Sequence, residues 1–425
     1  MPTLLAPLHQ HWHSGKQKMA STKKVFDLVI IGAGMMGSAA AYHSSQIPGT
    51  SVCLVGPSEP KVRKEHEIFG CWFDEGRICC RVHEKHTWSV LSSRSIQRYR
   101  EIEKQTGINF YSNVGNIQCL EKKEEFESLL QMNQQMTASA EDVSKKWNDI
   151  YPFFNFPDDI YILQEKVNAG HISPREQVRA HQTAALQHGT EIVRKIVSTV
   201  TPADNPDYKW QVETECGSVI YCTHVLVAAG GFAGLKNLFQ NVKPGMVPDL
   251  DLRTQTVAYL RIDEDEAQRL KTMPTLVTSC QFENLDGAYV LPPIKYPDGH
   301  WYLKLGHGRM YEEHKATLEE VREWYIRQTG NPECVEKLAR FMSHMLPGLK
   351  VKEVAGDGCL TSHTPGEEPY IDIIAENFGV CLGGNGYGAG SSDEIGRLAA
   401  RLLMLGEWDS DIPRERVKIV WKAQI

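Results

Sequence analysis

Hydrophobic positions near the start of the chain follow one another without the alternation of a half-exposed strand. Val25–Ile31 is an apolar, β-branched run broken only by Asp27, which indicates a buried strand of a parallel sheet. The run ends at Gly32-Ala-Gly34-Met-Met-Gly37, and the small residues from Ser38 to Tyr42 then predict a helix. A strand, a GxGxxG turn and a helix in this order are typical of a dinucleotide site.

Each glycine of this turn has a predicted role. The first permits the tight turn, the second lets a pyrophosphate approach the backbone, and the third lets the helix pack closely on the strand. Free N–H groups at the helix start would hold the anion. The second strand, Thr50–Val55, is expected to end on an acidic residue that binds the ribose. Gly56 stands there instead, so Glu59 is the predicted ribose partner.

Two further glycine-rich stretches follow apolar strands. Val225–Ala229 leads into Gly230-Gly231, and Val380–Leu382 leads into Gly383-Gly-Asn-Gly-Tyr-Gly-Ala-Gly390 before a helix that opens at Ser391. A glycine-rich loop before a helix is again suited to holding an anion or a polar carbonyl group. The residues predicted to contact the cofactor are Gly32, Gly34, Gly37, Glu59, Gly230, Gly384, Gly386 and Gly388.

Periodicity and turn residues predict the other elements. Ser173 followed by Pro174 and Glu176 is a helix start with proline in the first position and a capping box. The predicted helices are Trp88–Thr106, Lys122–Ala140, 173–189, Leu318–Gln328 and Pro332–His344. The predicted strands are Glu191–Val200, Trp210–Thr214, Arg253–Arg261, 288–293 and Trp301–His307.

Glycine loops at the beginning, middle and end of the chain predict a discontinuous cofactor domain. We therefore expect an α/β fold with a Rossmann-like cofactor domain and a mixed-sheet α+β substrate domain. The cofactor domain is assigned residues 25–109, 165–235 and 346–425, and the substrate domain residues 110–164 and 236–345. Residues 1–24, which contain no acidic residue, are predicted to be a disordered leader, with a transit peptide as the alternative.

Composition narrows the function classes. The 425 residues are 41% hydrophobic and 23% charged, as in ordinary globular enzymes. The net charge of -7 without a long basic run argues against nucleic acid as a partner. No apolar stretch approaches the roughly 20 residues that span a bilayer. Eleven irregularly spaced cysteines indicate a reducing compartment, and without a CxxC or HExxH motif no metal site is predicted.

Three basic residues are candidates for chemistry. Arg77 and Arg81 lie among aromatic residues and cysteines, which suits an anion site, although surface ion pairing is the simpler interpretation. Lys304 lies between Leu303 and Leu305 in a strand, so it faces the opposite side of the sheet from them. From the pattern alone, an exposed lysine on a half-solvated sheet is favoured.

Five blocks together resemble a known family. They are IIGAGMMGSAA, EGRICCR, HVLVAAGGFAG, WYLKLGHG, and CLTSHTPGEEPYID followed by GGNGYGAGSSDEIG. In order and spacing, over about residues 25–405, they resemble the FAD-dependent amine oxidases of the monomeric sarcosine oxidase and L-pipecolate oxidase family. The resemblance implies that the Rossmann-like domain binds FAD, with the flavin ring where the two domains meet.

The resemblance also implies roles for single residues. Lys304 matches the family's lysine over the flavin, which assists the reaction with dioxygen, and a cation there would stabilise developing negative charge. Cys359 matches the cysteine that carries FAD covalently in several relatives, a buried inert thiol being the alternative. Arg77 matches an arginine near the flavin. We therefore list Lys304, Arg77 and Arg81 as catalytic candidates.

The chain departs from the family in the groups that grip a substrate carboxylate. Arg81 comes four residues after Arg77 rather than three, so it is a shifted candidate for that role. Ala389 lies near the place of a family lysine, and Gly308 stands where the family has histidine, with His307 beside it. The substrate is therefore expected to differ from sarcosine itself.

The predicted function is FAD-dependent oxidation of a secondary or N-methylated amino acid to an imine, with dioxygen reduced to hydrogen peroxide. The alternatives are a dehydrogenase that uses another electron acceptor, a flavin-binding protein with little catalysis and, as a more distant third, a nicotinamide dehydrogenase. The expected partners are a small amine or amino acid and dioxygen, and the protein is expected to be a monomer. We expect a cytoplasmic location, because the chain ends in Ala423-Gln424-Ile425 rather than a peroxisomal SKL-like tripeptide.

Overall fold

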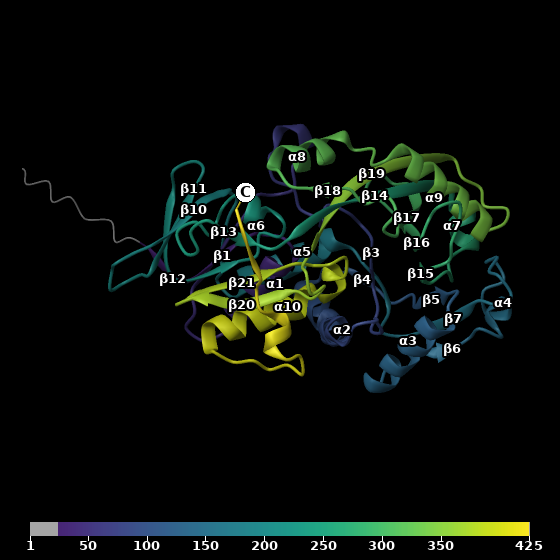
Figure 1. Ribbon diagram of the computed structural model, residues 1–425, viewed down its shortest axis with the longest axis horizontal. Helices are drawn as coiled ribbons and strands as arrows, with labels where there is room; N and C mark the ends of the chain where they lie inside the picture. Colours follow the sequence, from purple (N-terminus) through teal and green to yellow (C-terminus); the bar gives the residue numbers. More distant parts are fainter. Residues whose placement is uncertain (1–23, 425) are drawn as a thin grey trace, which may run out of the picture.

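Two large sheets organise the chain, one on each side of Figure 1. The computed structural model describes residues 24–424, so the predicted leader lies outside the described residues except for Lys24. The first sheet has eight strands: β1 (Val25–Ile31), β2 (Val52–Val55), β9 (Glu191–Val193), β10 (Val197–Pro202), β11 (Trp210–Thr214), β12 (Val219–Val227), β20 (Tyr370–Ala375) and β21 (Phe378–Leu382).

The centre of this sheet is parallel. The strands β9, β2, β1, β12 and β21 are neighbours in that order and run in the same direction. They come from segments far apart in the chain, which confirms an α/β fold of Rossmann-like type. The predicted strand Val25–Ile31 has the observed bounds of β1, because an apolar run without alternation suits a strand covered on both faces.

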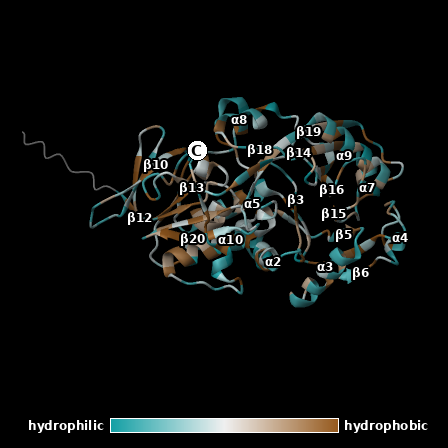
Figure 2. Ribbon diagram, viewed as in Figure 1, coloured by the Kyte–Doolittle hydropathy of each residue, from teal (hydrophilic) through white to brown (hydrophobic). Residues whose placement is uncertain are grey.

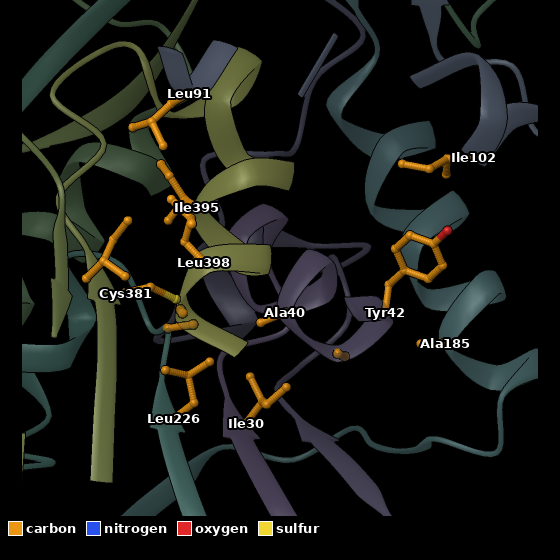
Figure 3. Packing of buried hydrophobic residues seen from close by; sticks show 14 of the residues in the cluster. Ile30, Ala40, Tyr42, Leu91, Ile102, Ala185, Leu226, Cys381, Ile395 and Leu398 are labelled. Atoms are coloured by element: carbon orange, nitrogen blue, oxygen red, sulfur yellow. The ribbon is translucent and has the colours of Figure 1, made fainter. Parts of the chain in front are cut away.

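Helices cover this sheet and form its core. The helices of the described chain are α1 (Met35–Ser45), α2 (His86–Thr106), α3 (Lys123–Gln135), α4 (Trp147–Ile150), α5 (Pro174–Gln187), α6 (Phe232–Leu235), α7 (Glu264–Arg269), α8 (Leu318–Arg327), α9 (Pro332–Met345) and α10 (Gly388–Leu405), with 3-10 turns at Arg63–Glu65 and Arg414–Val417. Figure 3 shows Ile30 and Leu226 of the strands beside Ala40 of α1 and Leu398 of α10, all within one buried cluster. Figure 2 shows hydrophobic colour concentrated around β20 and its neighbours.

The second large sheet has nine strands and is mainly antiparallel. Its strands are β5 (Asn116–Leu120), β6 (Glu141–Asp142), β7 (Tyr161–Glu165), β14 (Asp251–Ile262), β15 (Thr275–Thr278), β16 (Ala288–Lys295), β17 (Trp301–His307), β18 (His314–Lys315) and β19 (Glu353–His363). Helix α9 packs its apolar face against this sheet. The predicted strand Trp301–His307 has the observed bounds of β17.

Two small sheets complete the described part. The first joins β3 (Arg77–Cys79), β8 (Gly170–Ile172) and β4 (Tyr111–Ser112), and the second joins β13 (Met246–Pro248) and β22 (Trp421–Ala423). The first matters for function, because its pairing fixes the backbone that carries Arg77.

Three sequence predictions need correction. β19 pairs along its whole length with β14, so residues 353–363 belong to the second sheet rather than to the cofactor domain. The predicted strand Glu191–Val200 is two strands on opposite edges of the first sheet, because β9 pairs with β2 whereas β10 pairs with β11. The last helix opens at Gly388 rather than at Ser391.

Helix α5 begins with the N-cap serine that its sequence predicts. The Ser173 hydroxyl accepts a hydrogen bond from the Glu176 N–H at 3.2 Å, with Pro174 in the first turn. The Glu176 carboxylate pairs with Arg179 instead of closing the capping box. Ser173→Ala is expected to lower the free energy of unfolding by about 1 kcal/mol, because one N-terminal N–H loses its acceptor. Denaturant unfolding measures this; an unchanged midpoint would contradict the capping role.

Candidate active site

The carboxyl ends of the parallel strands open on one cavity. Gly32 follows β1, Gly230 follows β12 and Gly383 follows β21, and all three line this cavity. Ligands in open α/β sheets bind at this edge. The opposite wall includes Arg77 of β3 and Cys359 of β19. Because β19 belongs to the second large sheet, the cavity lies where the two sheets meet.

The first glycine turn is shaped by steric limits. Gly32 has φ +115°, and a Cβ there would lie 2.4 Å from the Ala228 carbonyl oxygen. A Cβ at Gly37 would lie 1.8 Å from the Gly32 oxygen, so the close packing of helix on strand is confirmed. A Cβ at Gly34 would meet only Trp72, at 3.5 Å. The protein itself therefore tolerates a side chain at Gly34, and the space it leaves is available to a ligand.

Two helix starts face this cavity. The caps of α1 and α10 are Gly34 and Tyr387, and neither supplies a side-chain hydrogen bond to the first turn. The first turns of both helices lack acidic residues. Met35 and Gly388, the first residues of the two helices, line the cavity. Their N-terminal N–H groups are therefore suited to an anionic ligand such as a pyrophosphate. Gly384 and Gly386, whose contact with a cofactor stays a prediction, line the cavity beside them.

The predicted ribose partner lies elsewhere. A Cβ at Gly56 would lie 2.5 Å from the Ala33 nitrogen, which explains why no acidic residue ends β2. The Glu59 carboxylate binds the Arg175 guanidinium at 2.6 and 2.7 Å and does not line the cavity. The ion pair with the first turn of α5 thus takes Glu59 away from its predicted role.

Lys304 is buried, although the pattern of its strand favours an exposed lysine. It is 0% exposed, so the expectation of a half-solvated surface lysine is wrong. Its ammonium donates to the Gly76 carbonyl at 2.7 Å and pairs with the Asp74 carboxylate. Arg77 pairs with the same carboxylate and donates to the carbonyl groups of Gly76 and Cys71, at 2.9 and 3.0 Å. Lys304 and Arg77, both predicted from sequence, are therefore joined by one buried anion.

The charges of this cluster depend on each other. Burial lowers the pKa of Lys304 to about 8, Arg77 acts in the same direction, and Asp74 opposes them. Burial works to raise the pKa of Asp74, but the charges of Lys304 and Arg77 hold it below its usual value. Asp74 was missed in the sequence; its spacing of three residues from Arg77 was the available signal.

Arg81 does not join this cluster. Its guanidinium donates to the Ser93 hydroxyl at 3.4 Å and the Met136 carbonyl at 3.5 Å, and it does not line the cavity. The backbone N–H of Arg81 donates to the Glu165 carboxylate at 3.0 Å, and this bond holds the backbone in the position from which the Arg81 side chain points away from the cavity. The predicted contact of Arg81 with a substrate carboxylate therefore has no support in this geometry.

Two cysteines line the cavity beside Arg77. Cys359, the predicted FAD anchor, lies on β19, and Cys71 lies in the loop before β3. Cys71 is exposed, whereas Cys359 is half-buried; burial raises the pKa of the Cys359 thiol, although the Arg77 charge acts against this effect. Cys71 was not singled out in the sequence, since only the folded chain brings it beside Cys359.

Two lysines that line the cavity were not singled out from the sequence. Lys195, between β9 and β10, and Lys236, after α6, both line the cavity. The Lys195 ammonium lies 2.7 Å from the Ser218 hydroxyl, and the Lys236 ammonium lies 2.6 Å from the Glu215 carboxylate. No motif marks either residue, because their proximity depends on strand order.

None of the described helices combines the length and apolar character needed to cross a membrane. Among residues 24–424, no group of three or more His, Cys, Asp or Glu side chains is arranged to hold a metal ion.

Comparison with known proteins agrees with this geometry. The model of the DAO family, described as FAD dependent oxidoreductase, matches residues 27–402. Monomeric sarcosine oxidase of Arthrobacter sp. is 22% identical over 92% of this chain and 96% of its own length. N-methyl-L-tryptophan oxidase of Yersinia pestis is 24% identical over 88% of this chain and 94% of its own length.

A solved structure shares the fold. L-proline dehydrogenase from P. horikoshii superposes with a TM-score of 0.71 at 16% identity, covering 93% of this chain and 97% of that one. At this identity the likeness describes the fold alone.

Proposed function

Because this chain belongs to the FAD-dependent oxidoreductase family, we propose that it oxidises the CH–NH bond of a secondary or N-methylated amino acid to an imine, with dioxygen as the electron acceptor. The substrate loses two electrons and two protons, and dioxygen takes them up as hydrogen peroxide. Water then hydrolyses the imine to an amine and a carbonyl compound. The names of the similar oxidases support this class of substrate.

The observation that carries this proposal is a pair of cations, the fully buried Lys304 and the half-buried Arg77, at the end of a glycine-lined cavity. One wall offers backbone N–H groups and glycines, which suit the pyrophosphate of FAD. The other wall presents Arg77, with Lys304 behind it on Asp74. A dinucleotide cavity that ends at fixed positive charge suits a reaction in which negative charge develops on an acceptor.

The residues present fit FAD as the cofactor. The turn at Gly32 and Gly34 and the first turns of α1 and α10 would hold its phosphates. FAD, when bound, supplies the two-electron chemistry that no side chain provides. Lys304 would hold positive charge beside the reacting dioxygen, and Arg77 would contribute to the same field. Arg81 has no part in this proposal, because its guanidinium bonds to residues outside the cavity.

A dehydrogenase that uses another electron acceptor is the second candidate, because the family, FAD dependent oxidoreductase, does not fix the acceptor. Purified holoprotein should be screened anaerobically for flavin bleaching with matched amines, N-methyl amino acids and proline-like acids. The active substrate is then used under air, and peroxide is counted against product. One peroxide per imine supports the oxidase, whereas bleaching with little peroxide supports the dehydrogenase. A flavin that stays oxidised with every amine would leave a flavin-binding protein with little catalysis.

We propose further that FAD is attached to Cys359 through a thioether: the thiol and one flavin carbon would each lose a hydrogen as the C–S bond forms, and the two electrons and two protons would pass to dioxygen as hydrogen peroxide. After acid precipitation, flavin colour is expected to stay with the pellet of the wild-type protein and to move to the supernatant for Cys359→Ala. Cys71→Ala is the matched control, because Cys71 lines the same cavity; its flavin should stay attached. If the wild-type protein releases its flavin, Cys359 is an inert thiol. If only Cys71→Ala releases it, FAD is attached through Cys71 instead.

The cytoplasmic location and the monomeric state stay predictions from the sequence. Size-exclusion chromatography with light scattering tests the second of them directly.

A further inference from the structure

Lys304 occupies a position where a lysine is not expected to stay charged without help. Its side chain is fully buried on β17, and removal from water penalises an ammonium group strongly. The Gly76 carbonyl, 2.7 Å away, is a dipole rather than a charge. Full positive charge on Lys304 therefore requires an anion close by.

Asp74 supplies this anion and is itself firmly held. It is 4% exposed and accepts five hydrogen bonds. One carboxylate oxygen accepts from the Tyr296 hydroxyl at 2.9 Å, the Tyr259 hydroxyl at 3.4 Å and the Glu75 N–H at 2.7 Å. The other oxygen is left for Lys304 and Arg77. The tyrosines thus orient the carboxylate toward the two cations.

Asp74 is the only anion among the described groups that face Lys304. Arg77 repels its charge, and burial lowers the pKa of His171 to about 4, so this histidine is neutral near pH 7. Burial raises the pKa of the thiol and the phenols in this region, so they are neutral as well. The charged and titratable groups facing Lys304 from the packed elements are Asp74, Arg77, His171, Tyr259, Tyr289, Tyr296 and Cys359.

We infer that Asp74 is a positioning residue for the oxidative half-reaction: it keeps Lys304 charged and fixed in place, and so sets the pH range in which the reduced protein reacts with dioxygen. This inference rests on the proposed oxidase function. Asp74 acts through Lys304 and is not among the residues that line the glycine-lined cavity. The mechanism is electrostatic, since one buried anion offsets the buried Lys304 ammonium and the half-buried Arg77 guanidinium across short contacts.

The test does not require the natural substrate. Holoprotein is reduced anaerobically with light or dithionite and mixed with dissolved dioxygen, and the return of the flavin absorption is followed over a range of pH. For the wild type, the rate is expected to fall as pH rises through about 8, because Lys304 then loses its proton.

Asp74→Asn removes the anion while keeping the shape of the side chain. We expect the midpoint of the pH profile to move at least one unit lower, so that reoxidation at the wild-type midpoint is at least about fivefold slower. Glu75→Gln is the matched control, because it removes a neighbouring charge that pairs with Arg175 rather than with Lys304. Asp74→Glu restores the charge and is expected to restore the wild-type midpoint.

Two further variants keep the test decisive. Asp74→Ser removes the same charge and leaves room for a water, and it is used if the Asn variant does not retain FAD. In a Lys304→Met background, Asp74→Asn should cause no additional pH shift, because its effect acts through Lys304.

A wild-type midpoint in both Asp74→Asn and Asp74→Ser overturns the inference, as does an equal shift in Glu75→Gln. Wild-type protein whose reduced flavin does not react with dioxygen overturns the oxidase proposal and this inference together. If the reduced wild-type protein does react with dioxygen but the Asp74 variants keep the wild-type midpoint of the pH profile, the inference alone is overturned.

Discussion

Replacing Lys304 with methionine is expected to slow the reaction of the reduced protein with dioxygen by about 10²- to 10³-fold, the usual effect of losing a preorganised charge or donor. Methionine fills a similar apolar volume but carries no charge, and the site loses its stabilisation of a superoxide-like anion. Reduction by an amine should change much less, because that half-reaction forms no superoxide-like anion for Lys304 to stabilise. Stopped-flow measurement of the two half-reactions separates these effects.

Matched variants guard this prediction against a merely structural loss. Lys295→Met makes the same replacement at an exposed position on the neighbouring strand β16, and both half-reactions should keep their wild-type rates. Lys304→Arg keeps positive charge and should recover part of the dioxygen rate. If Lys304→Met slows reduction and reoxidation equally, Lys304 has no special part in the reaction with dioxygen.

Gly37→Ala is expected to have the largest effect on the cofactor. The new Cβ would lie 1.8 Å from the Gly32 carbonyl oxygen, so α1 must move away from β1. Overpacking of this severity costs about 3 kcal/mol, and the displaced helix start no longer offers its N–H groups to the pyrophosphate. We expect FAD affinity to fall about 100-fold, measured by flavin titration of apoprotein alongside denaturant unfolding.

Two other glycines separate packing from ligand approach. A Cβ at Gly34 makes only an ordinary contact within the protein, so Gly34→Ala should keep its stability and yet bind FAD more weakly. A Cβ at Gly366 meets nothing within 4 Å, so Gly366→Ala should match the wild type in both measurements. If Gly37→Ala retains both stability and FAD affinity, the turn does not work as described.

Several elements of the Rossmann-like part could be predicted because the sequence patterns that define them are local. The strand, glycine turn and helix from Val25 onward lie in one stretch, and Gly37 is required by its contact with Gly32 in the same turn. The start of α5 at Ser173 is equally local. By contrast, Glu191–Val200 was predicted as one strand, because a β-branched run does not reveal that its halves pair on opposite edges.

The candidate site divides along the same line. The glycine turns and the strand that carries Lys304 follow from the amino-acid sequence alone, as does the resemblance that predicts Lys304, Arg77 and Cys359 near a flavin. The burial of Lys304, its contact with Asp74, which also pairs with Arg77, and the direction of Arg81 away from the cavity are seen only in the folded chain. The reason is physical: Asp74 and Lys304 are 230 residues apart, and a buried charge is defined by what surrounds it in space, which residue spacing along the chain does not encode.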